Sequence, residues 1–253
     1  MPEDAHAQAI STLSGLGPLR VWSLLVTVFG DLAPDGSLDG PTLSSVMDGI
    51  GIRAEATRVA LHRLRADGWI TSHKQGRISA HSLTPKGQQD SLAARPRIYG
   101  RPDAEQAGAK LVLMPDSAPV LDPADFAPVA PQLYLCATDT TCPDDAMILD
   151  PDRFPAWLGH RIEPTALRQG YAALHSALNA IAADADRLRD LDARDTAVLR
   201  VMIVHTWRRL VLKHPALPRD AHSHDWKGHA CRALATQLLD RYPRPTLDRL
   251  RAT

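Results

Sequence analysis

Basic side chains are concentrated in one short part of this 253-residue chain. Between Arg53 and Lys86 there are seven lysines and arginines and only two acidic residues, whereas the whole chain has 29 basic and 29 acidic residues. A local positive charge on a neutral chain is typical of a surface that binds an anionic polymer such as nucleic acid. The candidate DNA-binding residues of this stretch are Arg58, His62, Arg65, Lys74 and Arg77.

These residue types are suited to two kinds of contact with a duplex. Arginine on a helix can donate two hydrogen bonds to O6 and N7 of guanine in the major groove. Lysine and arginine on a hairpin mainly neutralise phosphates, which adds affinity with little sequence reading. We therefore expect Arg58, His62 and Arg65 to read base edges, and Lys74 and Arg77 to bind the backbone.

The stretch 43–84 has the order of elements of a winged helix-turn-helix. A short helix at 41–48 is followed by a turn at 49–51, a helix at 53–67, and a hairpin centred on Gln75 and Gly76. The helix at 53–67 ends at Gly68, a residue type common just after helices. Its apolar positions recur at the spacing of a buried stripe, and they are Thr57, Ala60, Leu61 and Leu64.

Other segments predict the remaining elements and an α+β fold. A helix at 14–30 closes the winged region, and another starts at Thr84 and Pro85 and runs toward Arg95. Short apolar runs predict strands at 110–114, 132–137 and 146–149. Amphipathic helices are expected at 166–183, 193–213 and 226–242. The expected organisation is a winged-helix domain at 1–94, a linker at 95–103, a small α+β domain at 104–160 and a helical domain at 161–253.

Composition excludes several other classes. A hydrophobic content of 44% is enough to build a core, and no run of about 20 apolar residues predicts a membrane span. The acidic N-terminus has no signal-peptide pattern. Cys136, Cys142 and Cys231 are an odd number without a CxxC pair, which is typical of a reduced protein. The sequence therefore predicts a cytoplasmic protein.

Three stretches of the chain resemble the PaaX-type transcriptional regulators, the repressors of phenylacetate catabolism and their relatives. They are VWSLLVTVFGD at 21–31, RVALHRLRADGWITSHKQGRISAHSLT at 58–84 with RIYG at 97–100, and VHTWRRLVLKHPALP at 204–218 with DWKG at 225–228. A weaker match is APVAPQLYL at 127–135. The stretches follow the family's order along most of the chain, so their combination is more specific than a winged helix alone.

The resemblance implies a winged helix, a ferredoxin-like middle domain similar to the CRISPR-associated Cas2 fold, and a C-terminal helical domain. It also implies a homodimer that binds a palindromic operator in double-stranded DNA and represses an aromatic-degradation operon. Release by an acyl-CoA is implied as well, with phenylacetyl-CoA the effector of the best-known members and other aryl-CoA thioesters as alternatives. The segment around 117–124 is shorter than in the family, and Lys227 stands where a proline is usual.

An acyl-CoA site needs cations for its phosphates and an apolar pocket for its acyl group. Outside the winged region, arginines and aromatic residues are densest near the end of the helix at 193–213. The candidate effector-binding residues are His205, Trp207, Arg208, Arg209, Lys213 and Trp226. The alternative is that the tryptophans belong to the core and the arginines are solvated. Arg208 and Arg209 diverge by about 100° around a helix, so they cannot both face one pocket in the same direction.

Histidines crowd the stretch 214–229, and four residues there are candidate ligands for Zn²⁺ or Ni²⁺. They are His222, His224, Asp225 and His229. The competing explanation is chance clustering, because the chain contains 11 histidines. No other metal or cofactor is expected.

Enzyme signatures are missing from the sequence, which has no P-loop, GxGxxG, GxSxG or HExxH pattern. The chain is therefore not expected to be an enzyme. One alternative is a metal-dependent nuclease that uses Asp116, the acidic residue after the first middle-domain strand. The other is a winged-helix module that binds proteins and not DNA.

Overall fold

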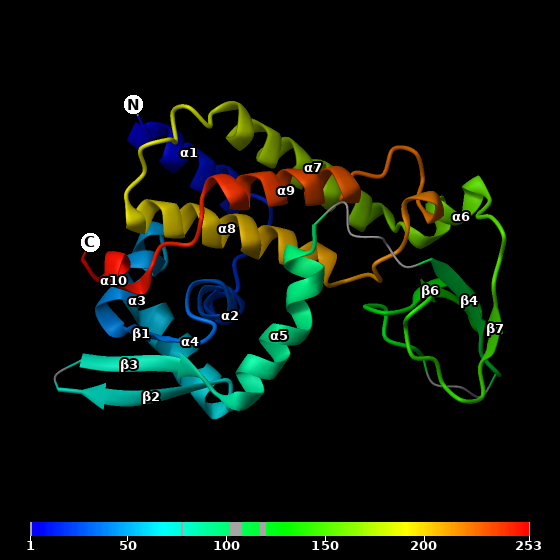
Figure 1. Cartoon of the computed structure of the whole chain (residues 1–253), viewed down its shortest axis with the longest axis horizontal. Helices are drawn as coiled ribbons and strands as arrows, with labels where there is room; N and C mark the ends of the chain where they lie inside the picture. The colour runs from blue at the N-terminus through cyan, green and yellow to red at the C-terminus, as the bar shows by residue number, and fades with distance from the viewer. Residues whose placement is uncertain (1, 77, 102–107, 117–119, 253) are drawn as a thin grey trace.

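The computed structural model describes residues 2–76, 78–101, 108–116 and 120–252. Within these ranges, ten α-helices, one short 3-10 helix and two small antiparallel sheets form a mixed fold, which confirms the α+β class. Figure 1 shows several helices stacked around α8 (Ala193–Val211), with one hairpin projecting from this body and the second sheet at the far end of the molecule.

The N-terminal region alternates helices with short strands. Its elements are α1 (Pro2–Ser14), α2 (Val21–Leu32), β1 (Ser37–Asp39), α3 (Gly40–Gly49), α4 (Ala54–Ala66), β2 (Ile70–Gln75), β3 (Ile78–Leu83) and α5 (Pro85–Tyr99). The strands form a sheet in the order β1-β3-β2, with Leu38 opposite His81 and Ile70 opposite Leu83. Helix α4 packs on α2, α3 and β2, so the hairpin and the basic helix form one unit.

The first helix predicted from the sequence is wrong in its bounds. Instead of one helix at 14–30, α2 begins only at Val21, and a separate helix α1 precedes it. Gly17, with φ of +146°, lies in the turn between them. The buried face of α1 includes Ala5, Ala9 and Leu13, and alanines produce only a weak apolar periodicity.

Helix α5 is longer than predicted. The sequence predicts that the helix ends near Arg95. In the structure it continues through Pro96 to Tyr99 and includes the first part of the expected linker. Tertiary contacts hold this last turn: the Tyr99 hydroxyl donates to Asp31 at 2.8 Å, and the Trp207 indole donates to the Ile98 carbonyl at 2.9 Å. Residues 102 and 103 of the expected linker, and 104–107 of the expected middle domain, lie outside the described residues.

The middle region holds the second sheet. Its elements are β4 (Ala109–Leu113), β5 (Ala127–Ala130), β6 (Leu133–Ala137), β7 (Met147–Leu149) and helix α6 (Ala156–Ile162). The three predicted strands are present, and β5 is an additional edge strand in the order β5-β6-β4-β7. Pro128 is tolerated in β5 because an edge strand leaves one side of its backbone unpaired.

A ferredoxin-like fold needs a helix in each of two crossovers, β4 to β5 and β6 to β7. The described residues of both connections are turns and loops. The ferredoxin-like prediction for this region is therefore not confirmed, although every pairing in the sheet is antiparallel.

Helices dominate the C-terminal region, as predicted. They are α7 (Thr165–Ala183), α8 (Ala193–Val211), the 3-10 helix η1 (Arg219–Ala221), α9 (Gly228–Arg241) and α10 (Leu247–Arg251). Helix α8 packs against α1, α2, α3, α7 and α9. Seven consecutive residues of α8, from Val201 to Trp207, are buried, as expected for a helix surrounded by others.

The N-terminal and C-terminal regions share one hydrophobic core. A single cluster of buried residues includes Phe29 and Met47 of the N-terminal region together with Val198 and Trp207 of α8. The middle region has two smaller clusters of its own. In the part of the chain that is described, no helix is both long and apolar enough to cross a lipid bilayer.

Candidate nucleic-acid interface and an adjoining cavity

A tight turn places α4 against α3. At the start of α3, the Asp39 side chain caps the helix by accepting a hydrogen bond from the Thr42 backbone N–H at 2.8 Å. The turn to α4 lies at the other end. Gly51, with φ of +86°, makes the turn, and Gly68, with φ of +69°, follows the end of α4. The predicted stripe of Thr57, Ala60, Leu61 and Leu64 is buried, so the sequence correctly identified the face of α4 that packs on the core.

The opposite face of α4 is exposed and carries the three predicted helix residues, Arg58, His62 and Arg65. Val59 lies on the same face with 71% of its surface exposed, and the sequence reading missed it. Val59 therefore adds one exposed apolar side chain to the basic face of α4.

Local ion pairs occupy two arginines of α4. Arg58 lies 2.9 Å from Glu55, with both side chains at least 70% exposed, so this pair adds little stability. Arg63 points toward another part of the surface, where it lies 3.8 Å from Asp67 and 5.6 Å from the centre of the Trp22 ring. Arg65 has its side chain in solvent on the face of Val59.

The hairpin β2–β3 follows α4 directly. Lys74 is exposed near its tip, and Gly76 turns the chain with φ of +62°. Arg77, the other predicted hairpin contact, lies outside the described residues. Ser72 and His81 bond across the two strands at 2.7 Å, which fixes the register of the hairpin near its base.

The six predicted effector residues do not come together. His205 is buried and lies 3.0 Å from the Thr27 hydroxyl, and burial lowers its pKa to about 3. Arg208 donates to the same hydroxyl and to the Ser23 carbonyl. Arg209 and Lys213 line a different, small cavity. Only Trp207 and Trp226 face a larger one.

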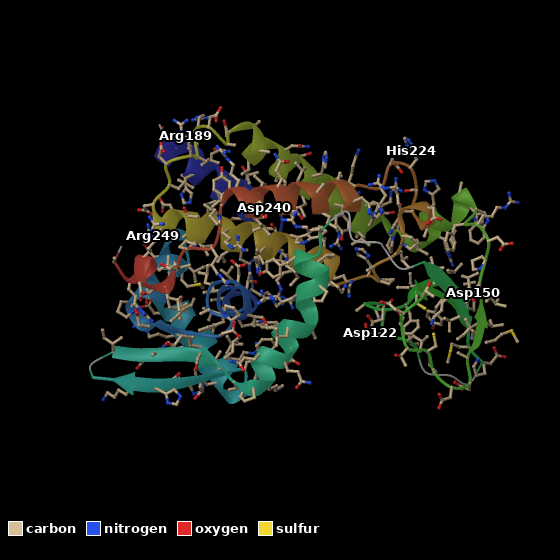
Figure 2. All side chains as sticks on the ribbon, viewed as in Figure 1. Asp122, Asp150, Arg189, His224, Asp240 and Arg249 are labelled. Atoms are coloured by element: carbon tan, nitrogen blue, oxygen red, sulfur yellow. The ribbon has the colours of Figure 1, made fainter. Side chains whose placement is uncertain are left out.

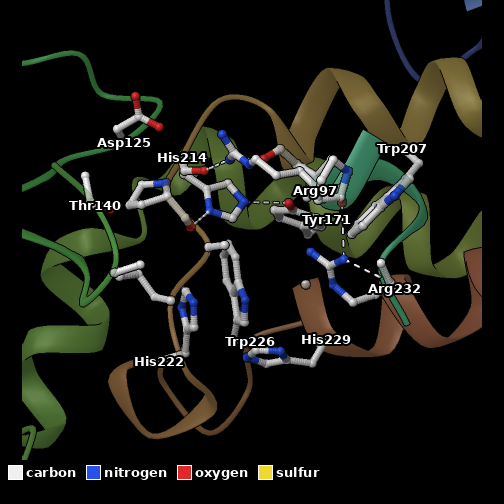
Figure 3. Close-up of a pocket in the computed structure, with 18 of the residues that line it drawn as sticks. Arg97, Asp125, Thr140, Tyr171, Trp207, His214, His222, Trp226, His229 and Arg232 are labelled. Carbon is white, nitrogen blue, oxygen red and sulfur yellow. Dashed lines mark hydrogen bonds between the residues drawn. The ribbon is translucent and has the colours of Figure 1, made fainter. Parts of the chain in front are cut away.

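This larger cavity, of about 350 Å³, lies where α5, the middle region and α7 to α9 meet. Figure 3 shows its aromatic and imidazole side chains between Asp125 and Thr140 at one end and Arg232 and Trp207 at the other. Tyr171 is fully buried, and its hydroxyl lies 2.6 Å from His214 Nε2. Burial lowers the pKa of His214 to about 4 and raises the pKa of Tyr171.

Two partly buried arginines line the cavity, and the sequence reading assigned them no role. Arg97, near the end of α5, donates to the carbonyls of Ala124, Val211 and His214. Arg232 of α9 donates to the carbonyls of Arg97 and Gly100, both at 3.2 Å. Burial lowers the pKa of each guanidinium. The RIYG motif at 97–100 was part of the resemblance, but nothing in its spacing pointed to a cavity.

The four candidate metal ligands lie in different surroundings. His222 Nδ1 lies 3.0 Å from the buried carboxylate of Glu163, and the Asp225 carboxylate pairs with Arg168. His224 is exposed and points away from the body (Figure 2), whereas His229 lies in the cavity wall. The residues described contain no group of three or more His, Cys, Asp or Glu side chains placed to hold a metal ion. Asp116 is exposed in a turn after β4.

Glu163 organises the loop that carries these histidines. Its side chain has no exposed surface and accepts hydrogen bonds from His222, from the Ser223 backbone and hydroxyl, and from Arg168. Burial alone raises the pKa of Glu163, but the hydrogen bonds from His222 and Ser223 bring it below its ordinary value. His222 in turn stacks on Trp226, with ring centres 4.7 Å apart.

Comparison with known proteins finds the same family at both ends of the chain. A family model described as "PaaX-like protein" matches residues 20–87, and one described as "PaaX-like protein C-terminal domain" matches residues 163–250. The chain is also similar to the transcriptional repressor PaaX of Escherichia coli (strain K12), with 24% identity over 260 residues. That alignment covers 88% of this chain and 81% of the repressor.

These matches place the protein in the class of transcriptional regulators. Within that class it belongs to the PaaX-like family, as the resemblance of its sequence implied. Membership of this family also supports the prediction that the chain acts as a regulator and not as an enzyme.

Proposed function

We propose that this regulator binds its operator as a winged helix-turn-helix, with α4 in the major groove and the β2–β3 hairpin on the phosphates. The exposed face of α4 carries the proposal: Arg58, His62 and Arg65 point away from the core to which the opposite face is anchored. An arginine there can donate to O6 and N7 of guanine, which for Arg58 means giving up its weak, exposed ion pair with Glu55. Lys74 on the hairpin is suited to neutralising a phosphate.

We further propose that the protein represses an aromatic-catabolic operon and binds a palindromic operator as a homodimer. A dimer with two α4 helices reads two half-sites whose centres lie a whole number of helical turns apart. An aryl-CoA thioester, with phenylacetyl-CoA as the first candidate, then releases the protein from DNA. The relation to a transcriptional repressor supports the direction of regulation.

Helix α5 supports the effector part of the proposal, because it physically joins the DNA-binding unit to the cavity. At its start, the Thr84 hydroxyl donates to the Gly68 carbonyl just after α4 and accepts from the Gly87 N–H. At its end, Arg97 lines the cavity. A helix of 15 residues spans about 22 Å, so a shift at the cavity can reach α4 through one rigid element.

The proposal is tested by fluorescence anisotropy on a labelled duplex from the protein's own promoter, against a scrambled duplex, with and without phenylacetyl-CoA. Specific binding that the thioester releases is the expected result. Replacing Arg58 and Arg65 by alanine, one at a time, is expected to weaken specific binding by about 1–3 kcal/mol each if they read bases.

Arg189→Ala is the matched control, because this exposed arginine lies on the side of the molecule away from the hairpin (Figure 2). Its affinity for DNA is expected to equal that of the unmodified protein. Specific DNA binding that the thioester does not weaken would leave the DNA-binding role standing and overturn the proposed effector. An absence of duplex binding at low salt would overturn the DNA-binding role and favour a protein-interaction module.

A further inference from the structure

Two of the three cysteines lie together in the middle region. Cys136, near the end of β6, is fully buried, and Cys142 is half-buried in the loop that follows, with five residues between them. Both belong to one small apolar cluster, in which Cys142 packs against Val112, Met114, Phe126 and Cys136. All three cysteines of the chain are free thiols in the structure. The pair is therefore close both in sequence and in space.

A tight turn after β6 brings the chain back toward Cys136. The Thr140 N–H donates to the Ala137 carbonyl at 3.0 Å, which closes the turn. The Cys142 thiol donates to the Thr140 carbonyl at 3.5 Å. Lys110 of β4, which lies opposite Cys136 in the sheet, donates from Nζ to the same Thr140 carbonyl at 2.8 Å. Hydrogen bonds from both sides therefore fix the position of the Cys142 thiol.

The two thiols are direct neighbours. Burial, together with the Cys142 thiol that shares a hydrogen bond with it, raises the pKa of Cys136 to about 12, and the nearby Lys110 ammonium acts in the opposite direction. Cys136 therefore stays a neutral thiol near pH 7. Cys142 is the more accessible of the two, so an oxidant in solution meets its sulfur first. An accessible thiol next to a second, protected thiol is the arrangement found in redox-sensitive pairs.

We propose that Cys136 and Cys142 form an intramolecular disulfide when the protein meets a hydroperoxide. The Cys142 sulfur gives up its proton and attacks the peroxide, whose O–O bond breaks. Cys142 becomes a sulfenic acid, and the released hydroxide takes up the proton as water. The Cys136 sulfur then attacks the Cys142 sulfur, the S–O bond breaks, and the leaving hydroxide takes the Cys136 proton as a second water. One hydrogen peroxide thus accepts two electrons from the two sulfurs, and excess dithiothreitol reverses the change.

The disulfide closes a ring at the edge of the large cavity. Ala137, Asp139 and Thr140 lie between the two cysteines in the sequence and line that cavity. Thr140 lies at the end of the cavity away from Trp207 (Figure 3). A disulfide tolerates only a narrow range of separations between its two Cα atoms. Oxidation therefore fixes one wall of the cavity covalently.

Peptide mapping of the full chain tests the assignment. The reduced protein is treated with hydrogen peroxide, denatured, alkylated with iodoacetamide and digested with trypsin. Both cysteines of the pair fall in the fragment 111–153, because no lysine or arginine lies between Lys110 and Arg153, whereas Cys231 falls in 228–232. The fragment 111–153 is expected to lack two hydrogen atoms and to carry no alkyl group. Dithiothreitol before alkylation is expected to restore both thiols.

Cys231 and three variants provide the controls. Cys231 is fully buried in the main core and is expected to remain a thiol, and Cys231→Ser is expected to form the disulfide as the unmodified protein does. Cys142→Ser is expected to lose the disulfide and to leave the Cys136 thiol open to alkylation. In Cys136→Ala the Cys142 sulfenic acid has no partner thiol, so dimedone is expected to trap it. Circular dichroism of each variant shows whether the fold is retained.

A fragment 111–153 that keeps two alkylated thiols, at a peroxide concentration that fully oxidises free glutathione, would overturn the assignment. A disulfide between two chains, or one that involves Cys231, would also overturn it, as would oxidation of Cys142 to a sulfinic acid without a disulfide. None of these measurements uses DNA or an aryl-CoA. The inference therefore goes beyond the proposed function, and its failure would leave that function untouched.

Discussion

Arg200 of α8 donates two hydrogen bonds to the carboxylate of Asp31, of 2.8 and 3.0 Å, across the junction of the C-terminal and N-terminal regions. Asp31 is almost fully buried and also accepts a hydrogen bond from the Tyr99 hydroxyl of α5. Arg200 further donates to the carbonyls of Leu239 and Tyr242. One buried ion pair therefore joins α2, α5, α8 and the end of α9.

Asp31→Asn is expected to destabilise the protein by about 3–5 kcal/mol, because it leaves the buried guanidinium of Arg200 without its counter-charge. Urea denaturation at neutral pH measures the free energy of unfolding. Glu55→Gln is the control, since the Glu55–Arg58 pair is largely exposed, and its effect should stay within about 1 kcal/mol. A similar small loss for both variants would contradict a structural role for the buried pair.

Stability is expected to fall as the pH decreases from about 6.5 toward 4. Burial lowers the pKa of His205 to about 3 and of His214 to about 4, whereas an unfolded histidine titrates near 6.5. Below pH 6.5 the unfolded chain therefore takes up protons that the folded chain does not, at a cost of up to about 1.4 kcal/mol per pH unit for each group.

Urea denaturation at pH 7.5, 6.5 and 5.5 measures this slope while carboxylates stay ionised. His205→Asn is expected to reduce the slope, whatever its effect on stability at pH 7.5. His224→Asn is the matched control, because His224 is exposed. A free energy of unfolding that does not change between pH 7.5 and 5.5 would contradict the neutral buried imidazoles.

Val59→Ala is expected to weaken binding to the operator while leaving the free energy of unfolding within about 0.5 kcal/mol. The exposed side chain of Val59 lies beside Arg58 and is suited to apolar contact with a thymine methyl group in the major groove. Affinity for a scrambled duplex should change less than affinity for the operator. Leu92→Ala on α5, which also removes an exposed apolar side chain, should leave both affinities unchanged.

Lys74→Ala is expected to weaken operator and scrambled duplex alike, since a hairpin lysine that binds phosphate does not read sequence. The slope of log affinity against log salt should decrease by about 1. Anisotropy titrations from about 50 to about 200 mM salt measure this slope, because the range spans physiological ionic strength. Lys213→Ala, which removes an exposed lysine just after the end of α8, should keep the slope. A selective loss of operator binding by Lys74→Ala would assign a different role to Lys74.

Gly87→Ala is expected to destabilise the joint between α5 and the hairpin by about 2 kcal/mol or more. A Cβ at this position would lie 2.3 Å from the Trp69 carbonyl oxygen, so the backbone just before β2 would have to move. Gly170→Ala provides the contrast, because its Cβ would meet only the end of the Leu210 side chain at 3.0 Å and alanine favours a helix. Thermal denaturation compares the two, and a neutral Gly87→Ala would contradict the close approach.

Much of the candidate DNA-binding unit could be predicted from the sequence because its signals are local. The buried stripe of α4 follows from the spacing of four residues, and Gly68 and Gly76 mark the ends of helix and hairpin turn by their backbone freedom. The start and end of α8 were predicted within two residues for the same reason. Strand β5 and helix α1 were missed, since Pro128 and the alanines of α1 weaken the pattern that each element needs.

The sequence by itself determined the family, the α+β class and the face of α4 that carries the basic residues, because each depends on residue order or helical spacing. The tertiary structure alone decided that both ends of the chain share one core and that α5 extends to Tyr99. It also brought Arg97 and Arg232 together across 135 residues. No local periodicity encodes such a contact, since it depends on how complete helices pack, and the cavity between them exists only after that packing.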